Sequence, residues 1–269
     1  MLLEIKQEDF VRLSKFILDE YGINLTQKKN LIEGRLGKTI LDKGFANFTE
    51  YVDHLLKTKS PDELDLLINK VTTNHTYFMR ESSHFDFFKD EILPEIEKTC
   101  KSKNLGIWCA ASSTGEEPYT MSIILKEYFE SKPQQWDTRM LATDISKRVL
   151  ATAMKGTYSE ESLKEMPDIW KKKYFTRSTE GYTVTQQIRD NVMFREFNLM
   201  DPIKFKMKFD VIFCRNVMIY FDQQTKDALV QRLFDVTNPG GYLLIGHSET
   251  LNKATTPFTY LKPATYRKI

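Results

Sequence analysis

Strand-like and helix-like segments alternate along the chain after about residue 104, and this alternation limits the fold more than any other feature. The segments "LGIWCA", "RMLATDI", "FDVIFCRN" and "GYLLIGH" are short apolar runs typical of buried strands. Helical patterns follow the first three, in "PYTMSIILKEYF", "SKRVLATAMKG" and "QQTKDALVQRLFDVT". The second of these helices should be capped by Ser146 and end at Gly156. The alternation predicts an α/β fold, with helices on both faces of a parallel sheet.

The first seventy residues have a different pattern, which predicts a small bundle of four short helices. Phe10, Leu13 and Ile17 recur at helical spacing in the first of them. The second helix is expected over residues 26–42. The fourth begins at "SPDE", where serine would be the N-cap, proline the first helical residue, and glutamate the partner in a capping box.

These patterns divide the chain into parts. We expect a helical bundle over 1–72, a linker with a connecting helix over 73–104, and an α/β domain over 105–269. Within the last part the rhythm breaks around 174–196, where β-prone residues flank a Glu-Gly turn. This break predicts a small antiparallel β insertion.

Composition excludes several classes of protein. The formal net charge of +2 is close to neutral, and no apolar stretch approaches the roughly 20 residues that span a bilayer. The N-terminal segment carries acids early and lacks the apolar core of a signal peptide. The three cysteines are scattered, without metal-ligand spacing. We therefore expect a cytoplasmic protein with reduced thiols and no bound metal.

A loop of small residues follows the first of these strands, in "WCAASSTGEEPY". Ala111, Ser112 and Gly115 would let a ligand lie against the backbone, and ligands of open α/β sheets bind beyond the carboxyl ends of the strands. The loop is neither a P-loop nor a G-x-G-x-x-G motif. Its two adjacent glutamates would repel a phosphate, which argues against nucleoside triphosphates and NAD.

A cofactor with a cationic end fits this loop better. S-adenosylmethionine has a sulfonium and an amino group but no phosphate. Asp144 ends the next strand, in "ATDI", where an acid can accept hydrogen bonds from ribose hydroxyls. The alternative is an ordinary turn with solvated acids, but Asp144 at the end of the neighbouring strand favours the cofactor.

Longer motifs make the assignment more specific. The segments "NHTYFMRE", "AASSTGEEPYTM", "ATDISKRVLATAMKGTYS", "FDVIFCRNVMIYFD" and "GHSET" resemble the CheR family of chemotaxis receptor methyltransferases, in the family's order and spacing. The resemblance implies a Rossmann-like class I methyltransferase sheet with an N-terminal all-α domain and a small antiparallel β insertion. It also implies methyl transfer from S-adenosylmethionine to glutamate side chains on the cytoplasmic helices of chemoreceptors, which sets adaptation in chemotaxis and leaves S-adenosylhomocysteine.

The resemblance further assigns roles to particular residues. Arg80 and Tyr220 are implied to be catalytic. The residues implied to bind the cofactor are Asn74, Thr76, Arg80, Ala111, Glu117, Asp144, Asn198, Leu199, Asn216 and Val217.

The chemistry agrees with such a site. A glutamate carboxylate has a pKa of about 4.3 and is ionised at neutral pH, so no general base is required. Arg80 could bind the incoming carboxylate in a planar fork, or form only a surface salt bridge. Tyr220 could donate a hydrogen bond to the substrate, or simply pack at a strand end. In enzymes that methylate amines or amides, prolines often follow the asparagine at the position of Asn216. The "RNVMIY" segment lacks them, which argues against such substrates.

The charge of the second helix and the length of the β insertion indicate which partners the protein could bind. Residues 26–42 with Lys43 form a basic helix that could steer acidic receptor helices, although a solvated face or an RNA site are alternatives. The near-neutral total charge argues against nucleic acid. The insertion looks shorter than in relatives that dock a receptor's C-terminal pentapeptide, so we expect no such docking. We also expect a monomer without membrane insertion.

Two other functions are compatible with the pattern. One is a methyltransferase of the same architecture acting on a small molecule or RNA, which would not need the basic bundle or the "NHTYFMRE" segment. The other is a non-catalytic protein that senses the cofactor, which should have lost Arg80 or the acidic contacts. Neither loss is seen.

Overall fold

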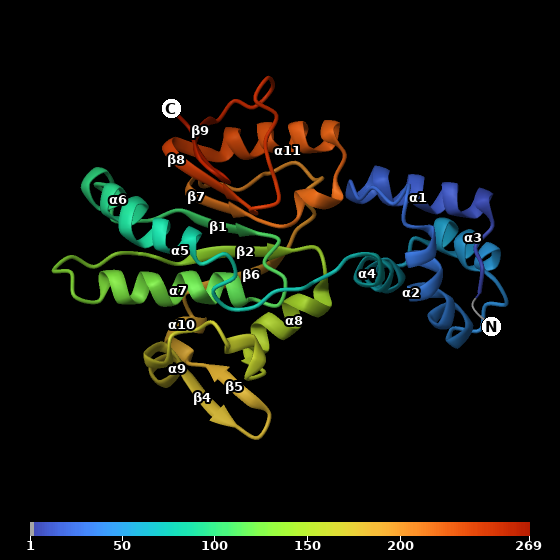
Figure 1. The fold of residues 1–269 in the computed structure, drawn as a ribbon, viewed down its shortest axis with the longest axis horizontal. Helices are drawn as coiled ribbons and strands as arrows, with labels where there is room; N and C mark the ends of the chain where they lie inside the picture. The colour runs from blue at the N-terminus through green and yellow to red at the C-terminus, as the bar shows by residue number, and fades with distance from the viewer. Residues whose placement is uncertain (1–2) are drawn as a thin grey trace. The chain divides into compact units, whose positions relative to one another are not determined.

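The computed structural model describes residues 3–269. The chain divides into two compact units (Figure 1). The first unit comprises Met1–Asn74 together with Tyr220–Thr225, and the second comprises His75–Ile219 together with Lys226–Ile269.

The first unit is built from four helices, as the apolar spacing predicts. They are α1 (Gln7–Tyr21), α2 (Lys29–Asp42), α3 (Phe48–Thr58) and α4 (Pro61–Val71). Leu13, Ile17 and Tyr51 are fully buried between them. Helix α2 begins three residues later than expected, at Lys29.

The expected capping box at α4 is wrong, although proline does occupy the first helical position. Ser60 makes no side-chain cap hydrogen bond. The reason is that Glu63 is turned elsewhere, because its carboxylate pairs with Lys43 at 3.5 Å and His54 at 3.3 Å. The Glu63 carboxylate is therefore not available to accept from the backbone N–H of Ser60, which is the second bond of a capping box.

The segment Tyr220–Thr225 is attached to the helices of the first unit. The backbone N–H of Asn24 donates to the carbonyl of Tyr220 at 2.8 Å, and Ile23 forms an antiparallel bridge with Phe221. The Tyr220 hydroxyl donates to the carbonyl of Thr73 at 3.0 Å. Tyr220 is thus held by backbone groups from two separate parts of this unit.

The second unit is organised around a seven-stranded sheet of order β6-β2-β1-β7-β8-β10-β9. The first five strands in this order run parallel, and β10 pairs antiparallel with both β8 and β9. The bounds are β1 (Ile107–Ala110), β2 (Met140–Asp144), β6 (Val192–Glu196), β7 (Phe209–Cys214), β8 (Thr237–Ile245), β9 (Thr259–Lys262) and β10 (Thr265–Arg267).

The strand order reverses direction at β1. The chain moves to one side through α7 (Glu116–Phe129) and to the other through α11 (Gln223–Val236), and right-handed crossovers place these helices on opposite faces of the sheet (Figure 1). Helix α8 (Lys147–Lys155) is capped as predicted, because the Ser146 side chain accepts from the N–H of Val149 and Gly156 adopts a left-handed conformation. A continuous helical segment of α5 (Ser83–Phe87), η1 (Phe88–Ile92) and α6 (Leu93–Thr99) precedes β1.

A three-stranded antiparallel sheet of order β3-β5-β4 forms the small β insertion. Its strands are β3 (Thr157–Tyr158), β4 (Phe175–Ser178) and β5 (Gly181–Val184), and α9 (Asp168–Tyr174) and α10 (Gln186–Arg189) flank them. Two short 3₁₀ turns are also present: η2 (Glu161–Leu163) lies in this unit, and η3 (Met218–Tyr220) ends at the first residue of the segment that belongs to the first unit. The insertion was expected around 174–196. Its first strand, β3, lies before residue 174, and the segment 192–196 is β6 of the central sheet.

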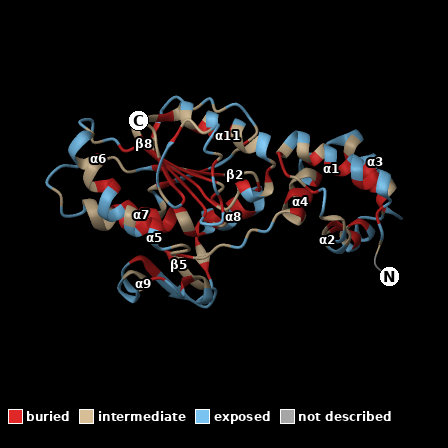
Figure 2. Ribbon diagram, turned by 45° about the horizontal axis from the view of Figure 1, so that its top comes forward, coloured by how far each residue is buried: buried red, intermediate tan, exposed pale blue. Residues whose placement is uncertain are grey.

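The core of the second unit lies along the central strands, which are almost entirely buried (Figure 2). Trp108 on β1 is fully buried, and its indole N–H donates to the hydroxyl of Thr143 on β2. Among the described residues, no helix combines the length and apolar character needed to cross a membrane. The fold class predicted from the sequence is confirmed.

Candidate active site

The loops that follow β1, β2, β7 and β8 emerge at one edge of the central sheet, because these strands are parallel. The loop after β1 turns sharply, with left-handed backbone at Ala111 (φ 69°), Ser113 (φ 48°) and Gly115 (φ 97°). At Gly115 a Cβ would lie 2.9 Å from the Tyr158 hydroxyl, so both backbone and packing require glycine there.

Asp144 joins the loops after β1 and β2. Its carboxylate accepts from the backbone N–H of Ser113 at 2.8 Å and of Ser146 at 3.0 Å. The carboxylate is therefore fixed at the end of β2, beside the loop of small residues. This is the position in which an acid can receive ribose hydroxyls.

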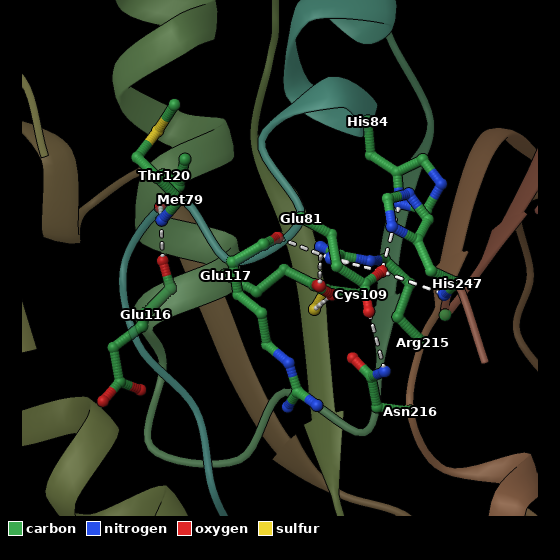
Figure 3. Close-up of polar contacts among 12 residues, drawn as sticks. Met79, Glu81, His84, Cys109, Glu116, Glu117, Thr120, Arg215, Asn216 and His247 are labelled. Atoms are coloured by element: carbon green, nitrogen blue, oxygen red, sulfur yellow. Dashed lines mark hydrogen bonds and ion pairs between the residues drawn. The ribbon is translucent and has the colours of Figure 1, made fainter. Parts of the chain in front are cut away.

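Glu117 on α7 is held by an arginine that the sequence analysis does not include among the site residues. The carboxylate of Glu117 accepts from Arg215 at 2.7 Å and from the thiol of Cys109 at 3.0 Å (Figure 3). The same guanidinium donates to Glu81 at 3.0 Å and to the carbonyl of Arg80 at 2.5 Å. Arg215 is 4% exposed, so its charge is neutralised inside the protein by these two acids.

Glu81 is the second acid that pairs with Arg215, and it is not among the residues predicted from the sequence. Its carboxylate accepts from Asn216 Nδ2 at 3.1 Å and from the backbone N–H of His247 at 3.1 Å, as well as from Arg215. Burial alone would raise the pKa of Glu81, but Arg215 and these hydrogen bonds lower it to about 2. The signal in the sequence is that Glu81 follows Arg80 directly and Arg215 precedes Asn216, inside motifs already assigned to the site.

The loops after β6 and β7 hold four of the expected cofactor residues. Asn216 has a left-handed backbone (φ 57°) and is joined to the site through Glu81. Val217 beside it is half-buried. Asn198 accepts from the N–H of Met200 at 3.0 Å, and the carbonyl of Leu199 accepts from Arg232 at 2.7 Å. These bonds fix the two loops, whereas a contact of their residues with a cofactor stays a prediction.

The segment "NHTYFMRE" is divided between the units. Thr76 and Arg80 lie in the second unit, and the guanidinium of Arg80 donates to the carbonyl of His75 at 2.6 Å. Within the described residues Arg80 forms no ion pair, which leaves its charge available for a substrate. Asn74 and Tyr220 belong to the first unit, so their roles at the site stay predictions.

Glu81, His84 and His247 bring possible metal-ligand atoms within 4.8 Å of one another. However, both oxygens of Glu81 already accept hydrogen bonds, and one of them faces the positive charge of Arg215. A cation would have to displace that guanidinium. The cluster is better described as part of the packing around Arg215, with His84 buried at 2% exposure.

The two cysteines of the central strands are poor nucleophiles. Cys109 and Cys214 are fully buried, and burial raises the pKa of each thiol well above its usual range. Cys214 is the last residue of β7.

The residues present fit S-adenosylmethionine. Glu117 in the first turn of α7 and Asp144 at the end of β2 provide two carboxylates that could accept hydrogen bonds from an amino group and from ribose hydroxyls. The loop between them is built from small residues. It also contains the buried hydroxyl of Ser112, whose oxygen has no hydrogen-bond partner among the described residues. A phosphate-bearing cofactor would be repelled by the same acids.

An open sheet of this order, with a small-residue loop after β1 and an acid ending β2, defines the chain as a class I S-adenosylmethionine-dependent methyltransferase. Two family models then identify it more closely. "CheR methyltransferase, SAM binding domain" matches residues 74–267, and "CheR methyltransferase, all-alpha domain" matches residues 8–72. The chain belongs to the CheR methyltransferase family.

Curated relatives agree over nearly the whole chain. The chemotaxis protein methyltransferase of Borreliella burgdorferi is 44% identical over 272 residues, covering 99% of this chain and 96% of the relative. The chemotaxis protein methyltransferase of Escherichia coli is 34% identical over 263 residues, covering 96% and 89%. A crystal structure of the glycopeptide N-methyltransferase MtfA overlaps 61% of this chain and 59% of its own, with 16% identity and a TM-score of 0.34. The family models make the chain a CheR-family methyltransferase that uses S-adenosylmethionine.

Proposed function

We propose that this enzyme methylates glutamate side chains on the cytoplasmic helices of chemoreceptors. The observation that carries the proposal is the presence of both family domains in one chain, the all-α domain at 8–72 and the cofactor domain at 74–267. A small-molecule methyltransferase would need only the second. The relatives that cover both domains are named chemotaxis protein methyltransferases.

The chemistry requires little acid–base help. S-adenosylmethionine supplies an electrophilic methyl group. We propose that Glu117 receives its amino group and Asp144 its ribose hydroxyls, while Arg80 and Tyr220 orient the incoming carboxylate. A carboxylate is ionised at neutral pH, so catalysis rests on orientation, which can lower a barrier by about 7–11 kcal/mol.

We further propose roles for the parts of the chain. Residues 1–72 would dock the receptor, 73–104 would link and 105–269 would carry out methyl transfer, in a cytoplasmic monomer that binds no nucleic acid. Of the basic residues around α2, Arg35 is committed to carbonyls of Lys70 and Thr72, and Lys43 pairs with Glu63. Lys29 and Lys38 form no ion pair among the described residues, so they are the best candidates for steering.

The test is incubation with methyl-labelled S-adenosylmethionine and receptor cytoplasmic fragments, with and without their C-terminal tails. Base-labile label on the receptor supports the proposal, because carboxyl methyl esters hydrolyse in base. Equal rates on tailed and tailless fragments are expected if the β insertion does not dock the tail. Label on RNA or a small molecule, with none on the receptor, would contradict the proposal.

A further inference from the structure

Glu249, in the "GHSET" turn after β8, is a buried acid without a cationic partner among the described residues. It is 8% exposed. Its carboxylate instead accepts three backbone N–H groups, from Gly246 at 2.5 Å, Asn216 at 2.9 Å and Ile219 at 3.2 Å. Two of these donors belong to the loop after β7, so one side chain ties two loops together.

The loop after β7 depends on these bonds for its conformation. Asn216 has a left-handed backbone, which asparagine tolerates better than most residues but which still costs some free energy. Without Glu249, the N–H groups of Asn216 and Ile219 would lose the carboxylate that accepts from both of them, which is unfavourable. The carboxylate offsets the strain by satisfying both donors.

The same loop carries two residues of the candidate site. Arg215 holds Glu117, the predicted acceptor for the cofactor's amino group, at 2.7 Å. Asn216 donates to Glu81 at 3.1 Å, and Glu81 in turn pairs with Arg215. A shift of the loop would therefore displace Glu117 through its own ion pair.

Gly246 provides independent evidence that the two loops are closely fitted. A Cβ at this position would lie 2.4 Å from Asn216 Nδ2, 2.8 Å from the carboxylate of Glu249 and 2.9 Å from the backbone nitrogen of Asn216. Only a hydrogen atom fits between them. The turn after β8 is thus packed against the site asparagine itself and not merely near it.

We propose that Glu249 is a positioning residue for methyl transfer, which fixes Arg215 and Asn216 in the arrangement that the cofactor site requires without touching the cofactor. The inference rests on the methyltransferase activity and not on the proposed receptor substrate. Burial raises the pKa of Glu249, while the backbone donors act in the opposite direction, which is consistent with an acid that is built into the fold.

The experiment compares Glu249→Gln with Glu63→Gln in the full chain. Both residues are 8% exposed, and Glu63 lies in the helical unit, so the same chemical change is made at equal burial. Glu249→Gln should raise the Kd for S-adenosylmethionine about tenfold, because an amide presents N–H groups to N–H donors. Glu63→Gln should lower the Tm and leave that Kd unchanged.

A second variant, Gly246→Ala, keeps Glu249 but places a methyl group against Asn216 and the Glu249 carboxylate. It should weaken cofactor binding by a similar factor, and binding is measured by calorimetry at a temperature where every variant is folded. Wild-type Kd in Glu249→Gln and in Gly246→Ala, with only the Tm lowered, would show that Glu249 merely stabilises the fold. Because binding of the cofactor is measured without receptor, failure of the proposed substrate would not produce that result.

Discussion

At the scale of single residues, Arg215 is the group on which two acids of the site depend. Replacing Arg215 with Met should lower the free energy of unfolding by on the order of 3 kcal/mol, because Glu81 and Glu117 are left as half-buried charges without a cationic partner. The substitution should also weaken cofactor binding. Urea denaturation and calorimetry measure the two effects.

Arg139 offers a matched control, because its ion pair with Asp137 is exposed. Replacing Arg139 with Met should change stability by less than about 1 kcal/mol. Equal losses in the two variants would show that burial adds nothing to the Arg215 pairs.

His84 predicts a pH dependence of stability. Burial, with Arg215 and His247 nearby, lowers the pKa of His84 from 6.5 to about 3. Below pH 6.5 the unfolded chain therefore binds a proton that the folded chain does not, so stability falls as the pH drops from 6.5 towards 3. Between pH 7 and pH 5 this residue should account for about 2 kcal/mol of that loss.

Replacing His84 with Asn should remove this residue's share of the fall in unfolding free energy with pH. Urea denaturation at pH 7, 6 and 5 measures that fall. His75→Asn, at an exposed position, serves as the control. If the unfolding free energy of His84→Asn falls with pH as steeply as that of the parent protein, then His84 is protonated in the folded state at pH 5 as it is in the unfolded state.

Residues of the site were predictable where a motif fixed their place, and not where partners came from distant segments. Asp144 could be placed because it ends an apolar run, and a strand end in a parallel sheet points to a ligand. The link between Arg215 and Glu81 could not be placed, because 134 residues separate them and no local pattern records such a pair.

At the scale of elements, the two serine caps make a matched pair. The Ser146 side chain accepts from the N–H of Val149 at 3.2 Å at the start of α8, whereas Ser60 makes no such bond at α4. Ser146→Ala should therefore cost about 1 kcal/mol of unfolding free energy, and Ser60→Ala almost nothing. Equal changes in the urea midpoint would contradict the assignment of the caps.

The same pair shows the limit of reading elements from sequence. Both serines precede a helical pattern, but the pattern does not record that Glu63 pairs with Lys43 and His54 in the folded chain. The last two strands, β9 and β10, were also not predicted individually. They have only four and three residues, too few for the alternation of a strand to be recognised.

At the scale of the whole molecule, the parallel part of the sheet could be predicted from the alternation of strands and helices. The division into two units could not be predicted from continuity of the sequence. Residues 220–225 are distant in sequence from the first 74, yet they belong to the same compact unit. The bridge of Ile23 with Phe221 produces this arrangement. Pairings between segments about 200 residues apart leave no trace in local periodicity.

The final prediction concerns how the whole enzyme meets its receptor. Lys29 and Lys38 lie on α2 without ion-pair partners among the described residues, so reversing both charges should slow encounter with acidic receptor helices and leave the chemical step intact. The double substitution Lys29→Glu and Lys38→Glu should lower kcat/KM for receptor fragments about tenfold at low salt, with kcat unchanged. The loss of kcat/KM should shrink near 0.15 M salt, where the Debye length is about 8 Å.

Reversing the charge of Lys253, an exposed lysine of the other unit, should have little effect. Equal losses in both variants, or a deficit that salt does not reduce, would mean that α2 does not guide the receptor.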